Sequence, residues 1–88
     1  MNYAHDPRKL AANVAKHGVW FQEAEAFEWE TALVKVDDRR RYEETRFEAT
    51  GYIGNRLHVM VFCLRENAVR IINLRKANSR EVKRYAET

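Results

Sequence analysis

The sequence contains one cysteine, one proline, three glycines and no long apolar run. Because Cys63 has no partner within the chain, an internal disulfide is excluded and nothing requires an oxidising compartment. No apolar stretch reaches the length that crosses a membrane, and the first ten residues lack the apolar segment of a signal peptide. We therefore expect a cytoplasmic protein with no membrane contact.

The composition is that of a globular protein: 45% of the 88 residues are hydrophobic and 33% are charged. This length suits one domain with one core, and no repeat or low-complexity tract divides it. We expect residues 1–88 to form a single domain.

Charge is distributed unevenly along the chain. Residues 1–44 carry 7 Lys and Arg against 9 Asp and Glu, whereas residues 45–88 carry 9 against 4. Arginine outnumbers lysine 11 to 5, and its planar guanidinium binds phosphate through paired hydrogen bonds. The second half is therefore a candidate surface for nucleic acid or phosphate, although a solvated basic face explains the same charge.

The start of the chain predicts a helix over residues 7–17. Asp6 suits the N-terminal cap, Pro7 suits the first helical position, and Gly18 suits the left-handed residue after a helix. A second helix is predicted from about Trp20 to Glu30, where apolar residues recur every third position.

Beyond residue 30 the apolar period changes to two, which indicates strands. Four are predicted, at residues 31–37, 45–53, 57–64 and 68–75, and the third is apolar on both faces, as in a central strand. A short strand at residues 2–4 is an additional possibility. Asn78 and Glu81 form a capping box that opens a short basic helix, ending near Glu87.

This order predicts an α+β fold. Two N-terminal helices pack on a four-stranded, possibly five-stranded, antiparallel sheet, and a short C-terminal helix follows. Such folds can leave one sheet face open, and we expect the basic residues to lie there.

The sequence resembles the BrnT family in three stretches, namely "KHGVWFQEAEAF", "DDRRRYEETRF" and "GNRLHVMVFCLRENAVRIINLRKANSREVKRY". The family pattern has Lys-His-Gly-Val at the end of the first helix, matched at residues 16–19. Its last strand reads Arg-Ile-Ile-Ser-Ala-Arg-Lys-Ala, matched at residues 70–77 except for Asn73 and Leu74. Trp20 and Glu43 also depart from the pattern, in place of a serine and a glycine.

The resemblance implies a RelE-like fold and a metal-independent endoribonuclease toxin of a type II toxin–antitoxin system. In the implied reaction the ribose 2′-OH attacks the adjacent phosphate. The resulting cleavage of RNA would inhibit translation and growth. The implied partners are RNA and a cognate ribbon-helix-helix antitoxin similar to BrnA, with operator DNA contacted only through that antitoxin. No cofactor is implied.

Arginines suit the negative phosphate of this reaction, and Arg75, Arg46 and Arg70 are the candidates that we expect to meet in one exposed pocket. An ion pair with Glu48 or Glu44 is the structural alternative for Arg46 and Arg70. The candidates for additional RNA contacts are Lys76, Arg39, Tyr42 and Arg80.

Proton transfer needs a group that titrates near neutrality, and the family pattern places His17 beside Lys16. A structural alternative is that His17 only complements the dipole at the helix C-terminus. The three histidines lack metal-ligand spacing and one cysteine cannot complete a zinc site, so we expect no metal site.

A second function remains open from the sequence. The chain can be a non-catalytic basic module that binds RNA or serves only as an antitoxin partner in operon repression. A generic DNA-binding protein is less favoured, because no helix-turn-helix pattern is present.

Overall fold

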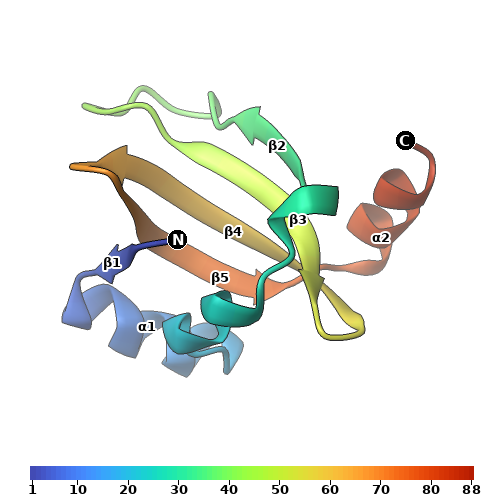
Figure 1. The fold of residues 1–88 in the computed structure, drawn as a ribbon, viewed down its shortest axis with the longest axis horizontal. Coiled ribbons are helices and arrows are strands. Elements are labelled where there is room, and N and C mark those ends of the chain that lie inside the picture. Colours follow the sequence, from blue (N-terminus) through green and yellow to red (C-terminus); the bar gives the residue numbers. More distant parts are fainter.

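The computed structural model describes all of residues 1–88. The elements follow the order β1 (Tyr3–His5), α1 (Pro7–His17), η1 (Phe21–Ala26), η2 (Trp29–Thr31), β2 (Leu33–Val36), β3 (Phe47–Ile53), β4 (Arg56–Arg65), β5 (Ala68–Lys76) and α2 (Ser79–Ala86), where η marks a 3₁₀ helix. The five strands form one sheet in the order β1-β5-β4-β3-β2. Figure 1 shows α1 and the two 3₁₀ turns together on one face, with α2 apart at the far end.

The sheet is mixed, which corrects the antiparallel prediction. β1 runs parallel to β5, with Tyr3 opposite Val69, whereas the other three pairings are antiparallel. The possible N-terminal strand is therefore real. It lies at the edge of the sheet, beside β5.

The prediction of a second α-helix from about Trp20 to Glu30 is wrong. Residues 21–26 and 29–31 form two short 3₁₀ helices, separated by extended backbone at Phe27, which bridges to Ile53. The apolar spacing of Phe21, Ala24 and Phe27 is three residues, which is the 3₁₀ repeat and falls short of 3.6. Gly51 makes room for this path, since a Cβ there would lie 2.7 Å from the Phe27 ring.

The signals for the two α-helices are confirmed. The Asp6 carboxylate accepts a hydrogen bond from the Arg8 N–H at 2.8 Å, and Gly18 adopts a left-handed φ of 71°. The Asn78 side chain accepts from the Glu81 N–H at 2.8 Å, and the Glu81 carboxylate accepts from the Asn78 N–H at 2.9 Å. None of the helices has the length and apolar character that a membrane crossing needs.

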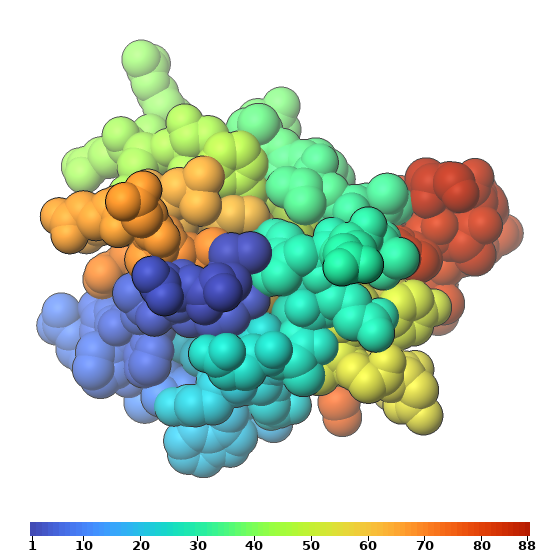
Figure 2. All heavy atoms as spheres, viewed as in Figure 1, coloured from blue at the N-terminus to red at the C-terminus, as the bar shows by residue number.

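The sheet has a packed face and an open face, and these names are used below. The packed face, covered by α1, η1 and η2, holds a core of ten buried residues: Val19, Phe21, Ala24, Phe27, Ala49, Met60, Phe62, Val69, Ile71 and Leu74. On the open face a small cluster of Leu57, Val59 and Ala77 is buried against Tyr52 of β3 and Tyr85 of α2. Val61 and Cys63 are buried on the same face, farther along β4. Figure 2 shows the packed side covered by the N-terminal third of the chain, with the C-terminal helix projecting from the edge.

β4 is the central strand, as predicted, and Cys63 and His58 are buried on it. β2 is an edge strand, and all four of its residues are exposed. The open face therefore begins at β2 and extends over β3 and β4 to β5.

Candidate functional site

A β-bulge in β5 decides which side chains reach the open face. Val61 pairs with Asn73 but Phe62 pairs with Ile71, so Ile72 is the extra residue. Such a bulge shifts the alternation of the strand by one. Leu74 therefore faces the core, and Asn73 and Arg75 project from the open face.

Asn13 fixes α1 against this bulge. Its side-chain amide donates to the Leu74 carbonyl at 2.7 Å and to the Val19 carbonyl at 3.0 Å, and its oxygen accepts from the Leu74 N–H at 3.1 Å. The side chain thus satisfies backbone groups of β5 beyond the end of β1. Sequence reasoning missed Asn13, although a polar residue on the apolar side of a helix is a usable signal.

The Asn13 tether brings the end of α1 to the rim of the open face. His17 Nε2 lies 3.4 Å from the Asn73 side-chain nitrogen. Burial, together with the nearby charges of Lys16 and Arg75, lowers the pKa of His17. These effects favour the neutral imidazole over the charged form.

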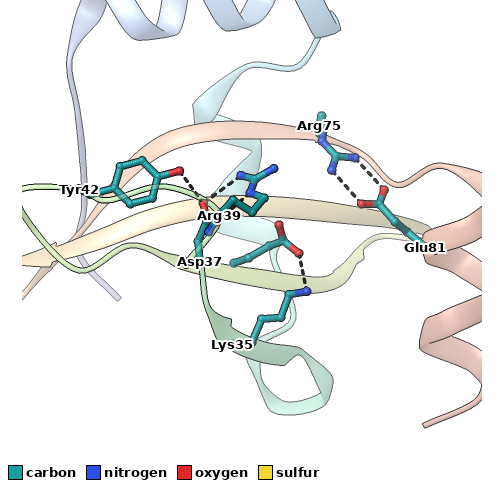
Figure 3. Close-up of polar contacts among 7 residues, drawn as sticks. Lys35, Asp37, Arg39, Tyr42, Arg75 and Glu81 are labelled. Atoms are coloured by element: carbon teal, nitrogen blue, oxygen red, sulfur yellow. Dashed lines mark hydrogen bonds and ion pairs between the residues drawn. The ribbon is translucent and has the colours of Figure 1, made fainter.

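The loop between β2 and β3 folds over the opposite rim. The Arg39 guanidinium donates to both oxygens of the buried Asp37 carboxylate, at 2.7 and 2.9 Å, and the Tyr42 hydroxyl approaches at 3.3 Å (Figure 3). The Arg39 hydrogen bonds hold the pKa of Asp37 at about 2. This carboxylate keeps the loop closed over the sheet and leaves most of the Arg39 side chain exposed, at 64%.

Arg46 carries an unused hydrogen-bond donor. Its guanidinium carbon lies 4.2 Å from the centroid of the Tyr42 ring, and its Nε atom is buried without a partner. A buried guanidinium N–H without an acceptor is unusual and costly. Arg46 therefore keeps a hydrogen-bond donor that no group of the protein satisfies.

Arg75 is engaged by a carboxylate. Its two terminal nitrogens donate to the two oxygens of Glu81 in α2, at 2.7 and 2.8 Å (Figure 3). This pair raises the pKa of Arg75 and lowers that of Glu81 to about 2. The Arg75 side chain remains 26% exposed.

These groups line one open pocket of about 500 Å³. The lining residues come from α1, the β2–β3 loop, β3, β4 and β5: Lys16, His17, Asp37, Arg39, Arg40, Tyr42, Arg46, Glu48, Val61, Ile72, Asn73 and Arg75. Five of the twelve are lysine or arginine and two are carboxylates. Asp37 and Glu48 are both paired, Glu48 with Lys35 at 3.7 Å, so the pocket attracts anions.

The pocket contains most of the residues that the sequence predicted. Of the candidates for the reaction, Arg75, Arg46, His17 and Lys16 lie there, and of the additional RNA contacts, Arg39 and Tyr42 do. Lys76 and Arg80 do not line it. The structural alternative for Arg46 is wrong, because Glu48 pairs with Lys35 and Glu44 pairs with Arg65 at 3.2 Å.

The expectation that Arg70 shares the pocket is wrong. Arg70 lies opposite Ala4 on β1 and Cys63 on β4, four β4 residues away from the Val59 that faces Arg75. The bulge keeps both arginines on the open face but leaves Arg70 at its far end. No carboxylate forms an ion pair with it, so its ion-pair alternative is also wrong.

A model of the family described as ribonuclease toxin BrnT of type II toxin–antitoxin systems matches residues 5–81. The chain belongs to the BrnT family. A structural comparison finds the crystal structure of the Brucella abortus ribonuclease toxin BrnT, with a TM-score of 0.66 and 28% sequence identity. The match covers 90% of this chain and 99% of that chain. A search of curated proteins found no match.

The family and this neighbour indicate a ribonuclease toxin of a type II toxin–antitoxin system. BrnT membership implies an antitoxin as partner and supports endoribonuclease activity. The α+β fold with its five-stranded sheet is likewise that of the Brucella BrnT. The pocket on the open face is the place in this BrnT chain where cationic side chains from distant segments meet.

Proposed function

We propose that this BrnT protein cleaves single-stranded RNA in the pocket on its open face, without a metal ion. The ribose 2′-OH attacks the adjacent phosphate and a 2′-O–P bond forms. The bond from phosphorus to the 5′-oxygen breaks, and that oxygen takes up a proton to leave as a 5′-hydroxyl. One observation carries the proposal: His17, Arg46 and Arg75, far apart in sequence, line the same cation-rich pocket.

Arg46 and Arg75 contact the phosphate in this proposal. A guanidinium keeps its charge at every physiological pH and offers five N–H donors. Arg46 has a buried donor without a partner, and Arg75, whose two terminal nitrogens donate to Glu81, lines the same pocket. Fixed positive groups of this kind stabilise charge that develops on phosphate in the transition state.

His17 moves the proton. A neutral imidazole accepts the proton of the 2′-OH, and its lowered pKa favours the neutral form at the pH of the cytoplasm, where we propose that the protein acts. Lys16 favours the neutral imidazole through its charge and adds a further cation beside the phosphate. The 2′-OH requirement distinguishes RNA from DNA as the substrate.

A cognate ribbon-helix-helix antitoxin, similar to BrnA, neutralises the toxin. The open face is basic, so the antitoxin covers it with acidic side chains, and operator DNA is contacted only through the antitoxin. In this arrangement free toxin inhibits translation and arrests growth.

The second candidate is a non-catalytic RNA-binding or antitoxin-partner module. The Arg75–Glu81 pair favours it, because a guanidinium already held by a carboxylate is less available to a scissile phosphate. The module would bind RNA without cutting it.

The experiment that separates them mixes purified protein with a defined single-stranded RNA in the presence of EDTA. We expect fragments from the wild type, and a loss of about 100-fold or more in rate with Arg46→Ala or His17→Ala. Arg56→Ala removes an exposed arginine outside the pocket and should cut normally. Intact RNA that is shifted in a binding assay would support the module instead.

A further inference from the structure

A second groove continues from the pocket over the edge of the sheet. It lies between α1 and the β5 bulge, has a volume of about 200 Å³, and is lined by Lys9, Ala12, Asn13, Lys16, His17, Ile72 and Asn73. Four of these residues also line the main pocket, so the two hollows form one path.

The groove is cationic and has an apolar floor. Lys9 and Lys16 stand two helical turns apart on the same side of α1, about 10 Å along its axis. No carboxylate lines the groove. Asp6, at the start of α1, accepts the Arg8 N–H as its cap. The half-buried Ile72, brought there by the bulge, offers a surface on which a base or ribose can pack.

The other end of the pocket has the opposite character. A shallow hollow of about 260 Å³ beside the β2–β3 loop is lined by four carboxylates, from Asp37, Asp38, Glu43 and Glu44. Arg40 and Arg46 are the cations there. Asp37 is paired with Arg39 and Glu44 with Arg65. The remaining carboxylates of this hollow, Asp38 and Glu43, balance its two cations, so it has no excess positive charge to hold the phosphates of an RNA strand.

We propose that the groove between α1 and the β5 bulge binds the nucleotides that flank the scissile bond on one side, and that the protein has no equivalent subsite on the other side. This inference rests on the proposed function only for the identity of the ligand. Lys9 supplies a phosphate contact outside the reacting pocket.

The first test measures binding to a single-stranded RNA whose 2′-hydroxyls are all methylated, so that cleavage cannot interfere. Fluorescence anisotropy across a series of salt concentrations gives the salt dependence of the affinity. We expect Lys9→Ala to make the log–log slope shallower by about 0.7, the value for one phosphate contact on a single strand. Affinity should fall about two- to fivefold.

Arg8→Ala is the matched control. Arg8 is the neighbouring cation on the same helix, its side chain is 93% exposed, and it lines neither hollow. The salt dependence of the affinity of Arg8→Ala should have the same log–log slope as that of the wild type. Equal slopes for Lys9→Ala, Arg8→Ala and the wild type would overturn the subsite, whether or not the protein cuts RNA.

The second test addresses the asymmetry. Substrates carry one free 2′-hydroxyl at a linkage that the wild type cuts, and are extended by methylated nucleotides on the 5′ side or the 3′ side. We expect kcat/KM to rise with extension on one side only, and Lys9→Ala to remove that rise. A similar gain from both sides would contradict the inference. Binding with the expected slope but no cutting would instead overturn the proposed cleavage and leave the subsite.

Discussion

At Arg75 the guanidinium is already occupied by a carboxylate before any substrate arrives. Glu81 holds it in a two-point ion pair and also closes the capping box of α2. The pair fixes the arginine in the pocket wall, but it also offsets the charge that would attract a phosphate. The two effects have opposite consequences for RNA, so a substitution at Glu81 separates them.

We predict that Glu81→Gln tightens RNA binding by up to about fivefold, because it removes the competing charge. Glutamine also completes a capping box, so α2 should remain folded. Glu87→Gln, which removes a carboxylate without an ion pair from the end of the same helix, controls for net charge. The measurement is the dissociation constant for methylated RNA. Weaker binding by Glu81→Gln than by Glu87→Gln would show that orientation of Arg75 matters more than its free charge.

The lowered pKa of Asp37 predicts how the free energy of unfolding depends on pH. Its pKa falls from 3.8 in the unfolded chain to about 2 in the fold, so the folded state binds its proton less readily. The contribution of the Asp37–Arg39 pair is therefore complete above about pH 4 and lost as the pH falls from there towards 2. Because Arg39 is largely exposed, we expect about 1–2 kcal/mol.

Chemical denaturation of the wild type and Asp37→Asn at several pH values checks this. The difference in free energy of unfolding should be largest above pH 4 and should shrink as the pH approaches 2. Asp38→Asn, which removes the adjacent exposed carboxylate, should show no such change. A constant difference between wild type and Asp37→Asn across the range would contradict the role given to the ion pair.

At the scale of elements, α1 and the β5 bulge act as one unit through Asn13. The Asn13 side chain makes three hydrogen bonds to backbone groups, two of them on Leu74. It positions His17 and Lys16 at the rim of the pocket. The site therefore depends on a residue that does not line the main pocket.

We predict that Asn13→Ala lowers the free energy of unfolding by about 2–4 kcal/mol, because buried backbone groups of Leu74 and Val19 lose their partners. Asn2→Ala, in the exposed N-terminal residues, should change it by less than about 0.5 kcal/mol. Thermal or urea unfolding measures both. A small loss for Asn13→Ala would mean that water replaces the side chain.

The elements also show what the sequence could predict. Caps at Asp6, Gly18 and Asn78 are local signals, and both α-helices were found from them. The bulge at Ile72 has no such signal, since no glycine or proline marks it, and it depends on pairing with β4. Register is a tertiary property, so the far placement of Arg70 could not be read from the sequence.

The region from Trp20 to Phe27 was misjudged for a different reason. Its apolar residues suit an α-helix or a 3₁₀ helix, and the choice is made by the docking of Phe27 over Gly51. The sequence predicted the site residues better than it predicted this element, because the cationic residues of the pocket were apparent from composition and from the family pattern. Asn13 was missed. Its place on the apolar side of α1 is a signal in the sequence, but its backbone partners on Leu74 and Val19 are known only once α1 is packed against β5.

On the scale of the whole molecule, the fold separates its apolar and charged residues between two faces. The core fills the packed face, while the open face gathers five cations around one pocket. Carboxylates crowd one end of this pocket and a cationic groove extends the other. This arrangement of charge is the basis of the path that we propose for an RNA strand over the sheet.

The most direct test of the central claim is the chemistry of the cut ends. RNA treated with the wild-type protein in EDTA should yield a 2′,3′-cyclic phosphate on one fragment and a 5′-hydroxyl on the other, as mass spectrometry would show. Methylating the 2′-hydroxyl at the cut linkage should abolish cleavage there. Fragments with 5′-phosphate ends, or cleavage that survives that methylation, would contradict attack by the 2′-OH in the open-face pocket.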